Sequence, residues 1–374
     1  MREEGAKTEE EAMNGSDVTR EGSEGGLPGR AAAPEMLRGG PGADGRGRRK
    51  GGKRGRGGRG EQLMAPPADF QSYYGRPVIK APAWRARDIA GYFFLGGLAG
   101  AGSVLAAGAH ATGRTTTATA MKVSSLVGVS LSTAALVNDL GRPGRFANML
   151  RVVKPTSPMS VGSWLLAAYG PAAGAAAASA VTGKLPRAGA LATGTAALLG
   201  PAVATYTAVL AADTAVPAWH GAHRELPYLF AASATAAASG MALVVGPVRE
   251  TGPARCAAVL AAVADEAVTK AVERRLGMVA ETWHQGRAGT LLRTARTLTA
   301  AGAAVGAAFG GRSRTLAAAG GLALLAGSAC TRFGVFAAGI ASAEDPKYTV
   351  VPQRAAKEAR RTTPTHSAER TQPT

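Results

Sequence analysis

Apolar blocks of about 20 residues are the feature that most constrains how this chain folds. Nearly all hydrophobic residues of the 374-residue sequence fall between Asp88 and Ser342, in blocks that short polar segments separate. A helix rises 1.5 Å per residue, so about 20 apolar residues cross the roughly 30 Å hydrocarbon core of a bilayer. The pattern predicts an all-α fold, a polytopic transmembrane helix bundle of about eight spans.

The bounds of the spans follow from the polar segments between them. The spans are predicted over residues 88–110, 119–138, 160–181, 188–212, 227–248, 253–276, 291–310 and 315–342. Pro201 is expected to break the fourth span, because proline removes a helical hydrogen bond. In the first span, Gly96 and Gly100 have the small-residue spacing that lets two helix backbones approach closely in a membrane.

Polar segments flank the predicted bundle, which takes up residues 88–342. Residues 1–68 are rich in glycine and charge and poor in core-forming residues, so a disordered N-terminal tail is predicted. Its basic run at 46–59 could bind RNA or anionic lipid, although a solvated tail that binds no specific nucleic acid is favoured. Residues 69–87 are a juxtamembrane lead-in whose tyrosines and Trp84 suit the headgroup region. Residues 343–374 are predicted to form a disordered C-terminal tail.

The charge of the two tails indicates the topology. An even number of spans places both termini on one side of the membrane. Lysine and arginine are nearly balanced between the loops of the two sides, whereas both tails are strongly basic. The positive-inside rule therefore predicts a multi-pass protein of the cell membrane with both termini in the cytoplasm.

Ionisable residues inside predicted spans are rarely kept without a role, because each costs at least a few kcal/mol in the bilayer. The candidates are Asp265, Glu266, Lys270 and Arg332. Glu266 and Lys270 are spaced to pair on one helix face, and Arg332 could pair with Asp265 or Glu266. One interpretation is a proton or charge relay through the bundle. The other is a peripheral sixth span whose polar face is solvated or neutralised. Lys122 lies close to a span end and is expected to snorkel as a structural residue.

The histidines and cysteines argue against a cofactor bound by this chain. Two cysteines are too few for a disulfide scaffold or a cysteine-rich metal or iron–sulfur site. The five histidines lie at span ends, in loops or in the tail, so no pair is placed to ligate a haem at membrane depth. No phosphate-binding loop, nucleophile elbow or zinc-protease motif occurs. We therefore expect no metal site and no catalytic centre of its own.

Two carboxylates end spans on the same predicted side. Asp139 follows the second span, and Asp213 follows the fourth, close to Trp219 and His220. A carboxylate at such a position could exchange protons with a quinol or quinone. The alternative for Asp139 is structural, with the preceding asparagine capping the helix and Asp139 forming a salt bridge to Arg142 or Arg145.

The segment that joins the second and third spans carries the most specific pattern. It reads NDLGRPGRFANMLRVVKPTSPMSVGSW from Asn138 to Trp164 and resembles the signature of the polysulfide reductase membrane subunit family, also called NrfD-like. The residues 92–97 of the first span and the segment from Asp213 to Trp219 also resemble that family. The resemblance extends from about Trp84 to Ser342.

The resemblance implies an eight-helix membrane anchor without bound cofactors. Such subunits pass electrons between membrane quinone, such as menaquinone, and a ferredoxin-like 4Fe-4S subunit. That subunit serves a molybdopterin oxidoreductase subunit, formate dehydrogenase-like or similar. The implied quinone site lies near the docking face, with Asp139 and Arg142 as motif positions and Asp213 and His220 as weaker candidates. The basic residues of the implied docking rim are Arg145, Arg151 and Lys154.

Three hypotheses of function stay open at this point. The leading one is a quinone-interacting membrane subunit of a multisubunit oxidoreductase. The second is an ion- or solute-translocating bundle that uses the charges of the sixth span. The third is a purely structural membrane anchor that only tethers partners to the lipid bilayer.

Overall fold

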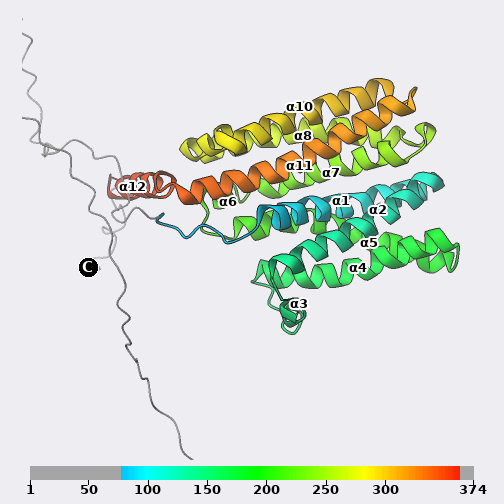
Figure 1. The fold of residues 1–374 in the computed structure, drawn as a ribbon, viewed down its shortest axis with the longest axis horizontal. Coiled ribbons are helices and arrows are strands. Elements are labelled where there is room, and N and C mark those ends of the chain that lie inside the picture. The colour runs from blue at the N-terminus through cyan, green and yellow to red at the C-terminus, as the bar shows by residue number, and fades with distance from the viewer. Residues whose placement is uncertain (1–76, 143, 363–374) are drawn as a thin grey trace, which may run out of the picture. The chain divides into compact units, whose positions relative to one another are not determined.

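The computed structural model describes residues 77–142 and 144–362, and long helices make up most of this part of the chain (Figure 1). The eight long helices are α1 (Ala86–Ala111), α2 (Thr115–Asp139), α4 (Pro158–Thr182), α5 (Pro186–Ala212), α7 (Leu226–Val245), α8 (Gly252–Leu276), α10 (Gly286–Phe309) and α11 (Arg314–Glu344). Each predicted span corresponds to one of them, and no strand occurs in the described residues. The all-α prediction is confirmed.

Most short elements lie at one end of the bundle, which we call the α12 end. They are α3 (Gly144–Met149), α6 (Pro217–His220), η2 (Gly277–Ala280), α9 (Glu281–His284) and α12 (Lys347–Thr362). The short helix η1 (Val248–Glu250) lies between α7 and α8 at the opposite end. The start of α1 and the end of α11 both lie at the α12 end, as an even number of spans requires (Figure 1).

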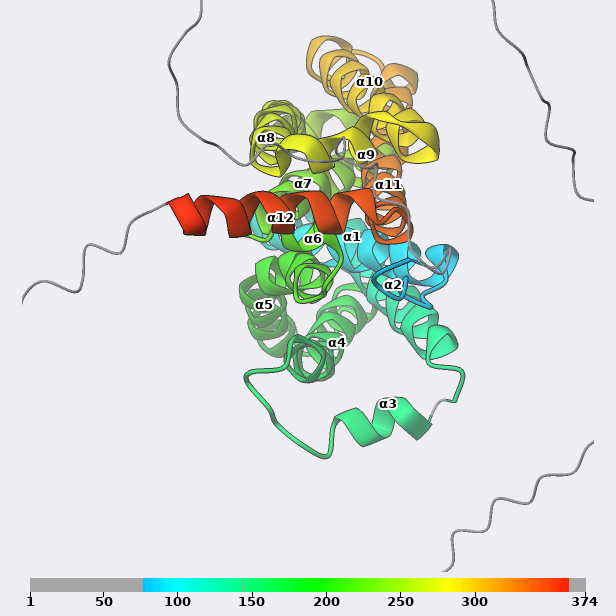
Figure 2. The ribbon, with the colours of Figure 1, turned by 90° about the vertical axis from the view of Figure 1, so that its left-hand side faces the viewer.

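The long helices form two groups of four (Figure 2). Helices α1, α2, α4 and α5 pack together as the first group, and α7, α8, α10 and α11 pack together as the second. The two groups meet mainly where α1 contacts α7 and α11 and where α5 contacts α7. Residues of α1 are therefore buried from both sides.

Small residues hold the helices close together. Gly100 of α1 lies against Gly200 of α5, and a Cβ atom on either would collide with the carbonyl oxygen of the other. Gly96 faces α2, where its added Cβ would lie 3.1 Å from Ser132 Oγ. The close approach predicted from the Gly96–Gly100 spacing is confirmed, with a different partner helix at each glycine.

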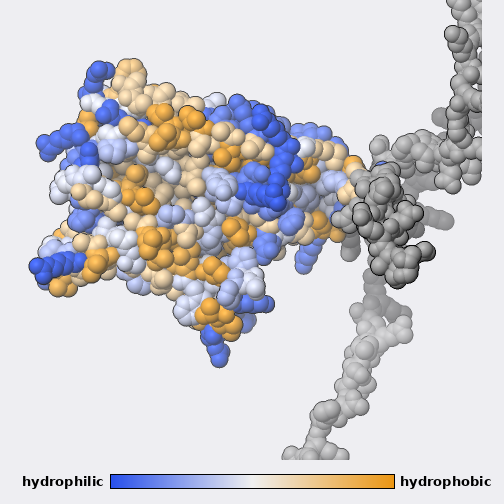
Figure 3. All heavy atoms as spheres, turned by 180° about the vertical axis from the view of Figure 1, so that it is seen from behind, coloured by the Kyte–Doolittle hydropathy of each residue, from blue (hydrophilic) through white to orange (hydrophobic). Residues whose placement is uncertain are grey.

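Six of the eight long helices in the described residues are long and apolar enough to cross a membrane, namely α1, α2, α4, α5, α7 and α11. Helices α8 and α10 are as long but carry more charge. In Figure 3 apolar and weakly polar residues cover much of the middle of one face, and strongly hydrophilic residues gather toward the ends. The chain is a membrane protein, and the side on which its termini lie stays a prediction.

The structure corrects the expected break at Pro201. Helix α5 continues through this residue from Pro186 to Ala212. Proline is tolerated inside helices of membrane bundles because neighbouring helices and hydroxyl side chains accommodate the backbone.

The predicted C-terminal tail is also corrected over residues 343–362. Helix α11 continues to Glu344, and α12 follows from Lys347 to Thr362. Tyr348 is buried, and Lys347 Nζ lies 2.8 Å from Glu281 Oε2 of α9, so the segment packs on the bundle instead of being free. Residues 363–374 and 1–76, including the predicted N-terminal tail, lie outside the described residues.

Candidate functional site

A small cavity lies between the first four long helices at the α12 end. Its volume is about 60 Å³. Its lining is mostly apolar and aromatic, with a carboxylate and two tyrosines among the polar members. The residues used below are Trp84, Tyr92, Asp139, Met149, Met159 and Tyr206. We call it the Asp139 cavity.

Asp139 stands at the last position of α2 and is fixed against the start of α1. Its Oδ1 accepts a hydrogen bond from the backbone N–H of Arg85 at 3.1 Å. The preceding Asn138 donates from Nδ2 to Oδ2 of the buried Asp88 at 2.9 Å. These two hydrogen bonds hold the half-buried Asp139 carboxylate at the rim of the cavity, between membrane and water.

The alternative salt bridge of Asp139 is not present in the described residues. Neither Arg142 nor Arg145 lies within 4.0 Å of an Asp139 carboxylate oxygen there. Arg145 donates from Nη1 to the Leu140 carbonyl oxygen at 2.9 Å, and Arg142 is exposed. The carboxylate is therefore not neutralised by these two cations.

Two tyrosines from different helices line the cavity. The ring of Tyr92 on α1 meets that of Tyr206 on α5 edge to face, with 6.2 Å between the centroids. Gly162 of α4 makes room for the Tyr206 ring, because an added Cβ would collide with it. The buried Tyr206 hydroxyl has no hydrogen-bond partner among the described residues. It is a donor that a ligand in the cavity could satisfy.

Trp84 connects the cavity to the core at the α12 end. Its ring stacks on Trp219 of α6, with 5.6 Å between centroids and 19° between planes. Trp219 is 1% exposed and donates from Nε1 to the Val335 carbonyl of α11 at 2.8 Å. Gly339 leaves the space for the Trp219 ring. Trp84, which forms one wall of the cavity, is thus held in place by Trp219, and Trp219 is hydrogen-bonded to the second group.

The other predicted proton-site residues do not line the Asp139 cavity. Asp213 is exposed where α5 ends. His220 is exposed on α6, its Nδ1 lies 3.0 Å from the Ala212 carbonyl oxygen, and its ring stacks on His223 at 5.8 Å. His220 lines a separate groove of about 810 Å³ beneath α12. The structure therefore separates His220 from Asp139.

The predicted docking residues lie on the segment around α3, which stands away from the bundle at the α12 end (Figure 2). Arg145, Arg151 and Lys154 are all exposed. The end of the segment is tied to α4, because Ser160 Oγ accepts from the Lys154 N–H and donates to the Val152 carbonyl, both at 3.0 Å. The basic side chains are available to a partner.

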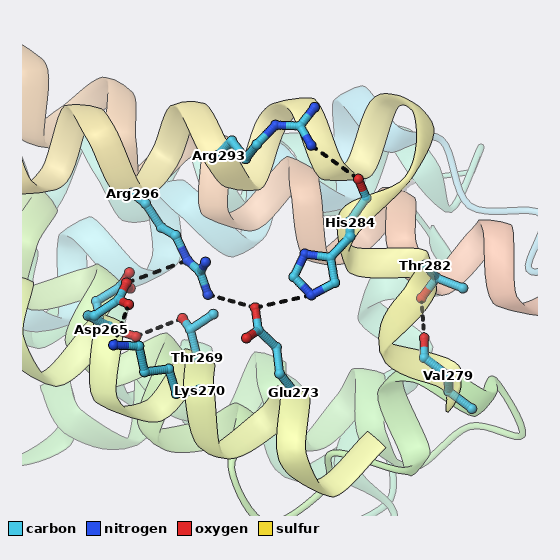
Figure 4. Close-up of polar contacts among 10 residues, drawn as sticks. Asp265, Thr269, Lys270, Glu273, Val279, Thr282, His284, Arg293 and Arg296 are labelled. Carbon is cyan, nitrogen blue, oxygen red and sulfur yellow. Dashed lines mark hydrogen bonds and ion pairs between the residues drawn. The ribbon is translucent and has the colours of Figure 1, made fainter. Parts of the chain in front are cut away.

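A polar seam joins α8 and α10 (Figure 4). The predicted pair between Glu266 Oε1 and Lys270 Nζ is present at 3.1 Å. Arg296 of α10 lies between two carboxylates, 2.6 Å from Glu273 and 3.5 Å from Glu266. His284 Nε2 lies 3.6 Å from Glu273. Arg296 and His284 were missed by sequence reasoning, because only the packing of α8 against α10 brings them to the acids.

Arg332 is completely buried, but its predicted ion pair is not formed. In the described residues no carboxylate oxygen of Asp265 or Glu266 lies within 4.0 Å of it. It donates instead from Nη2 to the Phe230 carbonyl at 2.6 Å, and its guanidinium stands 3.8 Å from the centroid of the Phe230 ring.

Lys122 was expected to snorkel toward the membrane surface, and this was wrong. Its side chain is 6% exposed and lines a small cavity with Ser103 and Ser125.

The comparisons with known proteins bear on the first group and on α7 of the second. Residues 83–252 match the family model described as polysulphide reductase, NrfD. The matched stretch contains α1 to α7 and the whole Asp139 cavity, whereas it ends where α8 begins. A comparison with curated proteins gives no match. Over residues 83–252 this chain is similar to the polysulphide reductase, NrfD, family.

Proposed function

We propose that this chain is the quinone-interacting membrane subunit of a multisubunit oxidoreductase. It passes electrons between a membrane quinone, such as menaquinone, and an iron–sulfur subunit that serves a molybdopterin catalytic subunit. The observation that carries the proposal is the Asp139 cavity, which lies within the NrfD segment at the α12 end. In this cavity the Asp139 carboxylate, which forms no salt bridge in the described residues, lies beside an aromatic and apolar lining.

The chemistry of the lining fits a quinone ring. Ligand sites are typically apolar with a few convergent polar groups. Here the aromatic walls would contact the ring faces, and the Tyr206 hydroxyl would donate to a ring oxygen. The cavity of about 60 Å³ is smaller than ordinary ligand sites of about 300–1,000 Å³. Met149 and Met159 line it, and their flexible side chains would move when the ring enters.

Asp139 supplies the proton transfer. When a quinol is oxidised, each of its two O–H bonds breaks, and two electrons leave the ring. Asp139 accepts the protons one after the other and releases them to the water at the α12 end, which its half-buried position allows. Quinone reduction runs through the same steps in reverse. The electrons go to the iron–sulfur centre of the partner.

The partner that we propose is a ferredoxin-like 4Fe-4S subunit that binds at the α12 end. The exposed cations of the α3 segment offer a surface for acidic residues of such a subunit. A molybdopterin oxidoreductase subunit, formate dehydrogenase-like or similar, would bind beyond it. The complex would lie in the cell membrane.

The test compares two carboxylates at equivalent helix ends. In the complex, Asp139→Asn should lower quinol-dependent electron transfer about 100-fold or more, since general acid–base groups contribute about 10²–10⁴-fold. Asp213→Asn is the matched control, because Asp213 is exposed and outside the cavity. Its rate should stay within about twofold of the wild type.

The other functions predict different results. A purely structural anchor leaves both variants fully active and binds no quinone analogue. An ion-translocating bundle shows flux in proteoliposomes that contain the chain alone, and Asp139→Asn leaves electron transfer unchanged. Full activity of Asp139→Asn would remove Asp139 from the mechanism.

A further inference from the structure

Two buried charged side chains in the second group take no part in the Asp139 cavity. Asp265 of α8 is 4% exposed, and Arg332 of α11 is 0% exposed. Oδ1 of Asp265 and both Nε and Nη1 of Arg332 have no hydrogen-bond partner within residues 77–142 and 144–362. Buried polar atoms are nearly always paired, and a buried carboxylate without a partner is satisfied when it binds a proton and becomes neutral.

The position of Arg332 is defined from three helices. Phe230 of α7 contributes both its carbonyl oxygen and its ring. Gly97 of α1 lies against the guanidinium, since an added Cβ would be 3.0 Å from Nη2. Arg332 therefore sits at the boundary between the two helix groups. Asp265 is close enough for the two charges to interact, although they form no direct ion pair.

The polar seam leads from the α12 end toward Asp265. It begins at the exposed His284 and continues through Glu273 and Arg296 to Glu266, with successive separations of 3.6, 2.6 and 3.5 Å. Glu266 lies ten residues before the end of α8, which is about 15 Å along the helix. Figure 4 shows Arg296 reaching from α10 toward the carboxylates of α8.

The seam and the buried pair differ in a way that points to a ligand. The carboxylates of the seam each have a cation within 4.0 Å. Asp265, one residue from Glu266, has none in the described part of the chain. Three charged groups act on it electrostatically, namely Arg332 of α11, Arg296 of α10 and Glu266 of its own helix. The smallest ligand that satisfies a buried carboxylate beside a cation is a proton.

We propose that Asp265 and Arg332 form a proton-binding site in the second group, loaded from the α12 end along the α8–α10 seam. A proton arrives from water, and an O–H bond forms on the Asp265 carboxylate. The fixed positive charge of Arg332 stabilises the carboxylate after the proton leaves. This site is separate from the Asp139 cavity and does not depend on quinone binding.

Infrared difference spectroscopy of the purified full chain tests the proposal. A pH step should produce a carboxylic acid C=O band that shifts when the protein is labelled with [4-¹³C]aspartate. The band should be absent in Asp265→Asn and present in Glu281→Gln, a control at an exposed carboxylate of α9. Its presence in Asp139→Asn separates this site from the proposed quinone site.

The route is tested by the rate of exchange into D₂O. Arg296→Met should slow the deuterium shift of the Asp265 band at least tenfold, whereas Arg293→Met, one turn nearer the α12 end, should not. If Asp265→Asn fails to fold, Asp265→Glu keeps a carboxyl group at this position, and its band should no longer shift with labelled aspartate. The site would be overturned if no labelled-aspartate band is lost when Asp265 is replaced. Unchanged exchange in Arg296→Met would overturn the route.

Discussion

Replacing Trp219 by phenylalanine should weaken both the bundle and the Asp139 cavity. Trp219 is 1% exposed and connects three parts of the chain at the α12 end. Its Nε1 donates to Val335, and its ring contacts Trp84 and Phe336 at centroid distances of 5.6 and 5.7 Å. Phenylalanine retains part of the ring contact and loses the hydrogen bond.

The magnitude follows from these contacts. A net intramolecular hydrogen bond contributes about 1 kcal/mol, and each aromatic pair contributes about 0.5–1.5 kcal/mol beyond its buried area. With part of the stacking kept, Trp219→Phe should lower the free energy of unfolding by about 2 kcal/mol. For a chain of this size, that corresponds to a fall in Tm of roughly 2–4 °C. Trp219→Ala, which also leaves a void, should lower the free energy by about 4 kcal/mol.

The assay is thermal unfolding of the purified chain in mild detergent, with Trp164→Phe as the matched control. Trp164 is 41% exposed, and its Nε1 lies 3.4 Å from the Val152 carbonyl, so its loss should change the free energy by less than about 0.5 kcal/mol. Because Trp219 supports Trp84, Trp219→Phe should also weaken binding of a quinone analogue severalfold. A Trp219→Phe variant as stable as the control would refute this account of the α12 end.

Three further predictions concern helix contact, α12 docking and partner binding. Gly100→Ala should destabilise the bundle by about 1–3 kcal/mol in detergent melts by forcing α1 and α5 apart, whereas Gly108→Ala, which meets nothing within 4 Å, should not destabilise it. A hydrogen bond from Lys347 lowers the pKa of Glu281, so this contact supports α12 docking above the ordinary glutamate pKa of about 4.3 and is lost as pH falls through the lower folded value. The protection of α12 amides against hydrogen exchange, relative to their intrinsic rates, should therefore fall at acidic pH in the wild type and be insensitive to pH in Lys347→Met. Loss of the three α3-segment cations should weaken binding of the iron–sulfur partner and reduce its salt dependence, measured by copurification, whereas Lys184→Ala at the opposite end should not. These cations are Arg145, Arg151 and Lys154.

The long helices were predictable because the bilayer restricts the secondary structure that an apolar block can adopt. The backbone of about 20 apolar residues finds no hydrogen-bonding partner in lipid. Such a stretch therefore forms a helix, which pairs its N–H and C=O groups internally. All eight predicted spans are helices, and the observed helices extend a few residues beyond most of the predicted bounds. The polar character of the sixth span was also visible in Asp265 and Glu266, and α8 is not among the helices apolar enough to cross a membrane on composition alone.

The site was only partly predictable, because its members meet through tertiary packing. Asp139 was found from its place at a span end, and it lines the cavity. Tyr206 lies in the middle of an apolar block, and nothing local indicates that its hydroxyl is unpaired. His220 was grouped with Asp213 because the two are close in sequence. It lines the groove beneath α12 and not the Asp139 cavity. The pairing of Trp84 with Trp219 joins residues 135 positions apart, which no local pattern contains.

The C-terminal segment shows how composition misleads. Its lysines, arginines and prolines are typical of a disordered tail. Tyr348 nevertheless packs into the bundle, and Lys347 binds Glu281, so a few contacts order the helix. Such contacts depend on where α11 ends and on the residues of α9, which the sequence of the tail does not contain.

Photoaffinity labelling tests the central claim, that the Asp139 cavity binds quinone, most directly. The purified chain would be irradiated with an azidoquinone, and the labelled peptides would be sequenced. We expect the label on the peptides that contain Met149, Met159 and Tyr206. Unmodified quinone should compete with the label. Ser163→Phe, which puts a large side chain into the lining, should strongly reduce the labelling. Label confined to the groove beneath α12, around Tyr348, or to the α8–α10 seam would contradict the account.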